Sequence, residues 1–151
     1  MKYTTEIRIG LPRTKVTELF CNTARLSSWQ PGLVSITHLE GEPGKQGARS
    51  ELLYAGRKGE LVISETVSVT DLPEKYHVIN RSKGIYNEVE NWFMEEEGIT
   101  LWRVVNTYRF RGLMVLMAPF MKQAFMHNTM LNMDRFKLYA ENPEQVNFKN
   151  N

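Results

Sequence analysis

The stretch LMVLMAPFMKQAFMHNTMLNMDRFKLYAE, residues 113–141, decides the fold of this 151-residue chain. It predicts one long helix, because apolar side chains recur at steps of three and four and Asn142-Pro143 follows as a stop. Pro119 lies in or near its first turns, so a kink there and a helix that starts only at Pro119 are both allowed. A helix of this length spans roughly 43 Å at 1.5 Å per residue, enough to cover one face of a sheet.

One face of this helix is rich in methionine. Methionine is flexible and adapts to irregular shapes, so this face suits the wall of a cavity for apolar ligands, and plain core filling explains it as well. A second apolar stripe is either buried too or offered to a partner, so the chain is predicted to be a monomer or a homodimer. The first face holds Met126, Thr129, Met130, Met133, Phe136 and Ala140, and the second holds Phe120, Ala124, Leu131 and Leu138.

Between the N-terminus and this helix, the chain is predicted to form strand after strand. Period-two alternation and links with Gly or Pro predict seven strands. Their short links imply antiparallel pairing, because parallel pairing needs crossovers of a dozen or more residues. Two short helices are expected after the first strand, over 12–20 and 23–29. The strands are expected at 2–10, 33–41, 48–55, 60–71, 75–83, 85–95 and 99–110.

The predicted fold class is therefore α+β. A seven-stranded antiparallel sheet curves around the long C-terminal helix, which covers its apolar face. Residues 1–141 are expected to form a single domain, and the polar residues 142–151 a loosely ordered tail. Wherever sheet and helix do not pack tightly, a cavity remains between them.

Composition and charge exclude several classes of protein. Apolar residues make up 42% and charged residues 24% of the chain, which is typical of a folded domain. The net charge is +2 and no run of Lys or Arg is long enough to follow phosphates, so we expect no nucleic-acid partner. The longest apolar run, Leu113 to Met121, holds nine residues, short of the roughly 20 of a membrane span. The N-terminus MKYTTEIRIGLP has no secretory apolar region, so we expect a cytoplasmic protein.

Metal and nucleophile chemistry have no support in the sequence. His38, His77 and His127 are far apart, and none has a ligand partner at i+3 or i+4. Cys21 is the one cysteine, which rules out an internal disulfide, and no histidine lies near it in sequence. We therefore expect no metal and no cofactor.

The strand predicted at 60–71 places a carboxylate on its apolar face. A carboxylate there is costly unless it is paired or protonated. Glu65 is therefore interpreted in one of three ways: as a cavity group with a raised pKa that anchors a ligand or moves protons, as the partner of an arginine, or as a residue lifted to the rim by sheet twist. The apolar face holds Leu61, Ile63, Glu65, Val67 and Val69.

The strand predicted at 99–110 has a more aromatic face that includes Trp102, Asn106 and Tyr108. If this face points inward, Asn106 and Tyr108 are polar groups that fix the orientation of an apolar ligand. Tyr108 is equally well explained as a core residue whose hydroxyl is satisfied locally.

The strand predicted at 85–95 alternates ambiguously. One face carries Glu88, Glu90 and Trp92 among others, and the other carries Asn87 and Asn91 between apolar residues. Trp92 is a weaker candidate for the site. Asn80, which shares a face with Val78 on the preceding strand, is weaker still.

Short motifs at turns and packing positions recur along residues 1–141. They are Pro12-x3-Val16-x2-Leu19-Phe20, Leu26-x2-Trp29-x-Pro31-Gly32, Gly41 with Gly47, Glu65-x-Val67-x3-Asp71-Leu72-Pro73, Gly98-x-Thr100 and Phe136-Lys137-x-Tyr139-x-Glu141. This set resembles the helix-grip fold of the START-like, or Bet v 1-like, superfamily, and within it most resembles the bacterial polyketide cyclase/dehydrase and lipid-transport group. The resemblance implies a cavity for a hydrophobic ligand. It does not decide among lipids, polyketides, hormones and quinones, or between binding and catalysis.

Three functions are compatible with these features. The first is binding of a small, mostly hydrophobic ligand between the sheet and the C-terminal helix. The second is a polyketide cyclase- or dehydratase-type enzyme in which Glu65, Asn106 or Tyr108 moves protons. The third is a protein-interaction module like the chaperone activators of similar fold. For the first, the apolar walls are Trp29, Trp92, Tyr108, Met126, Met130 and Met133, and the polar groups are Glu65, Asn80 and Asn106.

Overall fold

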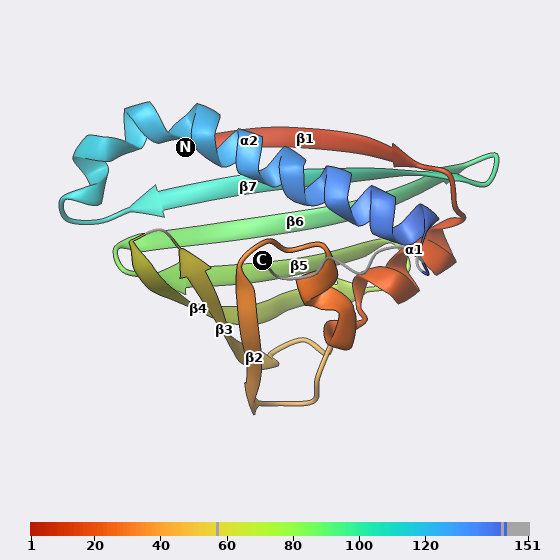
Figure 1. Ribbon diagram of the computed structural model, residues 1–151, viewed down its shortest axis with the longest axis horizontal. Helices are drawn as coiled ribbons and strands as arrows, with labels where there is room; N and C mark the ends of the chain where they lie inside the picture. Colours follow the sequence, from red (N-terminus) through yellow and green to blue (C-terminus); the bar gives the residue numbers. More distant parts are fainter. Residues whose placement is uncertain (57, 143, 145–151) are drawn as a thin grey trace.

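The computed structural model describes residues 1–56, 58–142 and 144, which form one sheet and one long helix (Figure 1). The predicted α+β class is confirmed, and the expected tail at 142–151 falls almost wholly on residues outside the described ones. The second short helix is a 3₁₀-helix. The elements are β1 (Lys2–Ile9), α1 (Arg13–Phe20), η1 (Thr23–Ser28), β2 (Leu33–Glu40), β3 (Arg49–Gly56), β4 (Gly59–Asp71), β5 (Lys75–Ser82), β6 (Ile85–Glu96), β7 (Ile99–Phe110) and α2 (Met114–Glu141).

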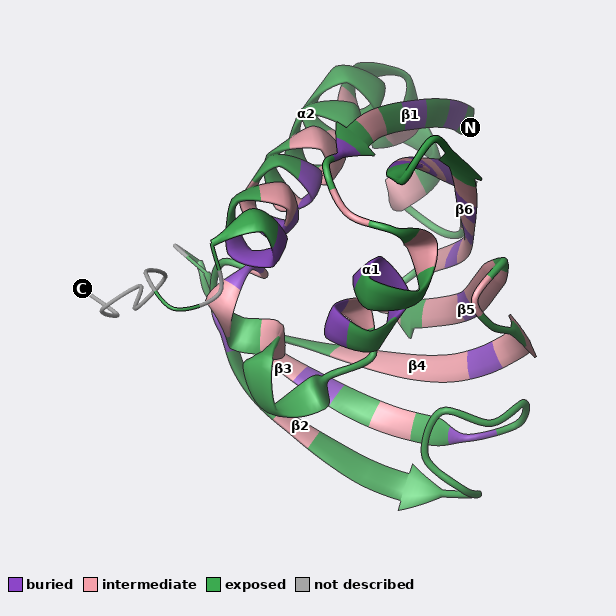
Figure 2. Ribbon diagram, turned by 90° about the vertical axis from the view of Figure 1, so that its right-hand side faces the viewer, coloured by how far each residue is buried: buried purple, intermediate pink, exposed green. Residues whose placement is uncertain are grey.

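All seven strands pair antiparallel in the order β1-β7-β6-β5-β4-β3-β2. The sheet curves, and both helices lie on its concave side, which we call the inner face (Figure 2). The long helix α2 packs mainly along β1, at one edge of the sheet. The strands toward the other edge, β2 to β4, therefore lack the cover of α2.

A β-bulge in β4 overturns one predicted face. Val67 pairs with Val78, but Val69 pairs with His77 instead of continuing the regular register. Because His77 and Val78 are neighbours in β5 and face opposite ways, Val67 and Val69 also face opposite ways. Val69 thus leaves the inner face on which the alternation placed it. Glu65 precedes the bulge and keeps the face of Val67.

The core is an aromatic cluster centred on Phe136 of α2, which is fully buried. Its ring centroid lies 5.0 Å from that of Trp29, 5.2 Å from that of Trp102 and 5.9 Å from that of Phe20. These rings come from the end of η1, from β7 and from α1. Each buried ring contributes about 1.5–3 kcal/mol, so the cluster ties the C-terminal half of α2 to the short helices and the sheet.

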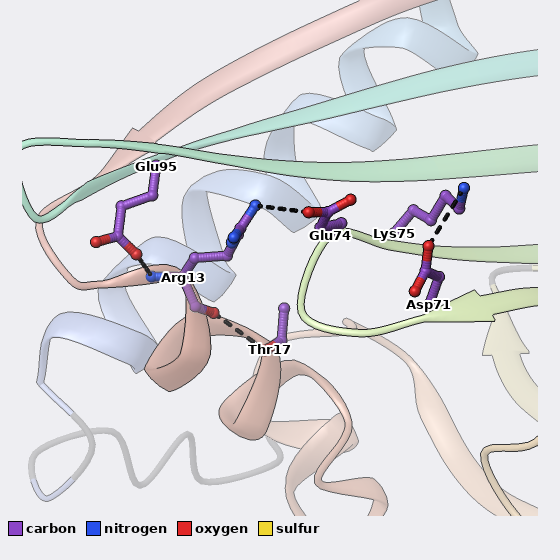
Figure 3. Close-up of polar contacts among 6 residues, drawn as sticks. All are labelled: Arg13, Thr17, Asp71, Glu74, Lys75 and Glu95. Atoms are coloured by element: carbon purple, nitrogen blue, oxygen red, sulfur yellow. Dashed lines mark hydrogen bonds and ion pairs between the residues drawn. The ribbon is translucent and has the colours of Figure 1, made fainter.

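Polar contacts hold the start of α1 against the loops at one end of the sheet (Figure 3). The backbone N–H of Arg13 donates to Glu95 Oε2 at 2.7 Å, and Arg13 Nη1 lies 3.8 Å from Glu74 Oε1. The Thr17 hydroxyl donates to the Arg13 carbonyl at 3.0 Å within the helix. The Arg13–Glu74 pair is exposed to solvent and contributes little free energy, whereas Thr17 is buried. Together these contacts orient α1 and the chain that leads into η1.

The second apolar stripe of α2 is uncovered in the single chain. Phe120 is 82% exposed and Leu138 is 54% exposed. Pro119 lies inside the helix, and the first turns of α2 bend away from the axis of the rest (Figure 1). In the described part of the chain, no helix is long and apolar enough to cross a membrane.

Truncation of Phe136 tests the role of the aromatic cluster. Phe136→Ala leaves a cavity at the centre of the cluster and is expected to lower the free energy of unfolding by about 3–5 kcal/mol. Leu138→Ala, on the exposed stripe of the same helix, is expected to lower it by less than about 1 kcal/mol. Urea unfolding followed by circular dichroism measures both. Equal losses would contradict the assignment of Phe136 as the centre of the core.

Candidate functional site

A cavity of about 430 Å³ lies between η1 and strands β2 to β5. This volume is in the range of small-molecule sites. The sequence placed the cavity under the C-terminal helix, but its described lining comes from η1 and the sheet, because α2 lies along β1 at the opposite edge. The apolar part of the lining includes Leu26, Leu33, Ile36, Leu52, Val67 and Tyr76.

Glu65 is the only carboxylate among the described residues that line this cavity. Burial raises its pKa from 4.5 to about 7, and the described residues form no ion pair with it. Of its three interpretations, this placement fits a cavity group with a raised pKa. The charged form of Glu65 also raises the pKa of Tyr54 and of Tyr76, after the larger effect of their own burial. Near neutral pH the carboxyl can therefore either donate or accept a hydrogen bond.

A line of polar side chains crosses the inner face from β3 to β7, and we call it the polar row. Residues directly opposite in antiparallel strands share a face, so each member lies beside the next. Glu65 belongs to this row and also lines the cavity. The polar row consists of Ser50, Glu65, Asn80, Asn87 and Tyr108, each paired with the next.

Asn106 lies diagonally beside the row and is bonded to it. Asn87 Nδ2 donates to Asn106 Oδ1 at 3.0 Å, and the two residues are only 7% and 3% exposed. We call them the amide pair. Within the described part of the chain, Asn80 Oδ1, Asn87 Oδ1 and Asn106 Nδ2 are buried without a hydrogen-bond partner. Each such atom costs about 1–3 kcal/mol unless something pairs with it.

Tyr108, at the end of the polar row, has the local environment of a core residue. Its ring packs 4.8 Å from Phe125 and 6.0 Å from Phe110, centroid to centroid. Its hydroxyl lies 3.5 Å from that of Tyr3, which lies 2.9 Å from Thr129 Oγ1. Burial raises the pKa of Tyr108 above its ordinary range. A proton-transfer role therefore has less support at Tyr108 than at Glu65.

The exposure of the methionines on this face of α2 falls from the N-terminal to the C-terminal half of the helix. Met126 is 40% exposed, Met130 is half-buried against the core, and Met133 is 1% exposed. The described lining of the cavity includes none of the three. Met133 is therefore core filling. Phe125 packs against the rings of Tyr108 and Phe110, and the sequence did not indicate these contacts. Phe125 therefore makes more ring contacts in this region than Met126 does.

The two candidate tryptophans lie elsewhere. Trp29 is 3% exposed within the aromatic cluster around Phe136 and is not among the described lining of the cavity. Trp92 lies on the outer face of the sheet, where Lys75 Nζ is 5.7 Å from its ring and its Nε1 donates to Glu90 at 3.3 Å. The core residue Phe93 follows it in β6 and takes the inner face. Trp92 therefore does not join the site.

Asn87 belongs to the polar row and was not identified as a candidate from the sequence. Its strand has apolar residues on both faces, so alternation alone did not show which face is buried. Two inward asparagines four residues apart, Asn87 and Asn91, were the available signal. Among the described residues no group of three or more His, Cys, Asp or Glu could hold a metal.

The fold and cavity together define a helix-grip protein, and solved structures of this fold match it. The chain aligns over 99% of its length with 99% of the Zhui aromatase/cyclase from Streptomyces sp. R1128 (TM-score 0.80, 9% identity). It aligns over 96% with the whole of TTHA0849 from Thermus thermophilus (0.75, 13%), and over 93% with 97% of Ara h 8.0201 (0.72, 13%). At these identities the likeness confirms the START-like, or Bet v 1-like, resemblance at the level of the fold. No protein-family model and no curated protein matches the sequence.

Replacement of Glu65 by Gln tests the buried carboxyl. The Glu65 carboxyl binds its proton more tightly in the folded protein than in the unfolded chain. Its contribution to the free energy of unfolding is therefore full below pH 4.5 and is lost as the pH rises through about 7. As the pH rises from 4.5 to 8.5, the wild type loses this contribution and Glu65→Gln does not. The free energy of unfolding of the variant minus that of the wild type is therefore expected to rise by about 1–3 kcal/mol. Urea unfolding across this pH range measures the difference.

The matched control is Glu51→Gln, which changes an exposed carboxylate on the neighbouring strand. Its difference from wild type is expected to stay constant across the same pH range. An advantage of Glu65→Gln that does not grow with pH would show that the carboxyl is not held in its neutral form by burial.

Proposed function

We propose that this protein binds a small, mostly apolar molecule in the cavity between η1 and the sheet. The observation that carries the proposal is the 430 Å³ cavity, whose described lining is apolar in its larger part, has Glu65 as its one carboxylate, and includes the polar residues Thr23, Ser27, Ser35, His38 and Ser50. Mainly apolar walls with a few placed polar groups are typical of a small-molecule site. The apolar walls supply affinity and Glu65 supplies orientation.

The comparisons support this proposal without naming a ligand. The Zhui protein is described as an aromatase/cyclase, so this fold accommodates small-molecule chemistry in at least one of the matched structures. The fold alone decides neither ligand nor reaction. The bacterial polyketide cyclase/dehydrase and lipid-transport group therefore remains our prediction for the nearest functional relatives.

A second candidate function is catalysis in the same cavity. It is favoured by one observation, the pKa of Glu65 near 7, because a general acid or base works best with a pKa near the operating pH. Glu65 would then move a proton on the bound molecule, as in a cyclase or dehydratase. Turnover of a bound ligand into a second compound distinguishes this function from binding alone.

An interaction module has weaker support, because such a module needs no ligand cavity and the described residues line one. The exposed stripe with Phe120 and Leu138 is the surface that a second copy of the chain would use. The choice between a monomer and a homodimer stays a prediction.

Filling the cavity tests the proposal. The probe is 1,6-diphenylhexatriene, a fluorescent hydrocarbon that binds through apolar contacts alone. We expect saturable binding of one molecule per chain to the wild type. Ser50→Phe places a ring in the cavity wall and is expected to weaken binding at least tenfold, on the order of 1.4 kcal/mol or more.

The control is Glu51→Phe, which adds the same ring on the outer face of the same strand. It is expected to bind the probe as the wild type does. An absence of binding to the wild type, or equal weakening by both replacements, would contradict the proposal.

A further inference from the structure

The inner face of β6 and β7 holds two kinds of buried asparagine. Asn91 is fully used by the protein, because its Nδ2 donates to the Tyr76 carbonyl at 3.0 Å and its Oδ1 accepts from Trp102 Nε1 at 3.0 Å. Asn87 lies four residues earlier on the same face and bonds only to Asn106. The burial of Asn91 is explained by the two hydrogen bonds that it makes within the fold. The burial of the amide pair is not, because each of its two residues keeps an atom without a partner.

The amide pair leaves one donor and one acceptor open in either orientation. With Asn87 donating, the open atoms are Asn87 Oδ1 and Asn106 Nδ2. If both amides are turned over, Asn106 donates and the open atoms become Asn87 Nδ2 and Asn106 Oδ1. Asn80 Oδ1 adds a further acceptor beside them. A hydroxyl group can both donate and accept here, and a carbonyl can accept from the open N–H.

The described strands offer no Lys or Arg on the inner face to an anionic ligand, and the histidine of the described cavity lining, His38, hydrogen bonds through Nε2 with the Gly41 carbonyl at 2.6 Å. Seven Lys and Arg side chains occur in the described strands, and each is adjacent in sequence to an inner-face residue, so each lies on the outer face. The described lining of the cavity contains no Lys or Arg, and its one carboxylate, Glu65, repels anions. The seven are Lys2, Arg8, Arg49, Lys75, Arg81, Arg103 and Arg109.

The three asparagines lie beside the cavity wall across the sheet, and the described lining of the cavity includes Glu65 but none of them. Asn80 pairs directly with Glu65 on one side and with Asn87 on the other, and adjacent strands lie about 4.8 Å apart. Tyr3 pairs with Asn106, and its hydroxyl lies 2.9 Å from Thr129 Oγ1, so this turn of α2 lies over the pair. The next residue, Met130, is half-buried, and its flexible side chain can yield to a ligand group.

We infer that the bound molecule carries an uncharged polar group, a hydroxyl or a carbonyl, that hydrogen bonds to Asn80, Asn87 and Asn106. The three asparagines then select neutral alcohols and ketones against carboxylates and phosphates. This inference rests on the proposed function and specifies the chemistry of its ligand. Asn87 and Asn106 are specificity-determining residues, and Glu65 marks where the polar row meets the cavity.

The test compares two ligands with the same ten-carbon chain, 1-decanol and decanoate, as competitors of bound 1,6-diphenylhexatriene. At pH 6 decanoate is ionised, whereas Glu65 is mostly protonated, so its charge does not decide the result. We expect 1-decanol to displace the probe from the wild type at a concentration at least tenfold lower than decanoate.

The double variant Asn87→Leu/Asn106→Leu removes both amides together, so neither is left unpaired by the loss of the other. It is expected to lose about tenfold in affinity for 1-decanol relative to decanoate, with both ligands measured against the probe affinity of the variant itself. Asn91→Leu is the matched control on the same face. It is expected to lower stability, because it breaks two internal hydrogen bonds, and to keep the preference for 1-decanol.

The outcomes separate this inference from the proposed function. If the probe does not bind to the wild type, both fall. If the probe binds but decanoate competes as well as 1-decanol, the inference falls and the proposed function stands. The same holds if the double variant keeps the preference for 1-decanol. If decanoate competes as well as 1-decanol on the wild type, the inference falls even if the double variant does not fold.

Discussion

The packing of Phe136 against the rings of Phe20, Trp29 and Trp102 fixes where the rest of the molecule lies. It brings the C-terminal half of α2, α1, the end of η1 and β7 together in one buried cluster, while α2 runs along β1. Because α2 is committed to that edge, it does not cover β2 to β4. η1 covers these strands instead, and the cavity lies between them.

The inner face is therefore divided into two regions with different chemistry. Near the aromatic cluster, the buried amide of Asn91 is paired at both ends, with Trp102 and with Tyr76. Along the polar row, burial holds Glu65 of β4 with a raised pKa, and Asn87 of β6 and Asn106 of β7 keep open hydrogen-bonding atoms. Buried polar groups without partners are found at functional sites, and Trp29 Nε1 in the aromatic cluster is a further one among the described residues.

Sequence reasoning predicted the elements well, because period-two and period-3.6 alternation report local geometry. The strand 99–110 and its aromatic inner face are as expected, as is the burial of Phe136. The failures have two physical causes. Alternation does not show which face is buried when both carry apolar residues, so Trp92 was included and Asn87 was missed. Alternation also cannot show a β-bulge, and the bulge in β4 turns Val69 outward. Nor can it show the cross-strand register, which places Asn80 directly opposite Glu65.

If the cavity holds a small, uncharged molecule, the protein should carry it through purification. Native mass spectrometry of the freshly purified protein, followed by denaturation and extraction of any released compound, tests this. We expect a discrete added mass that denaturation releases and that belongs to a neutral compound with a hydroxyl or carbonyl group. A chain that carries no added mass, and still carries none after incubation with neutral alcohols and ketones, would contradict this expectation.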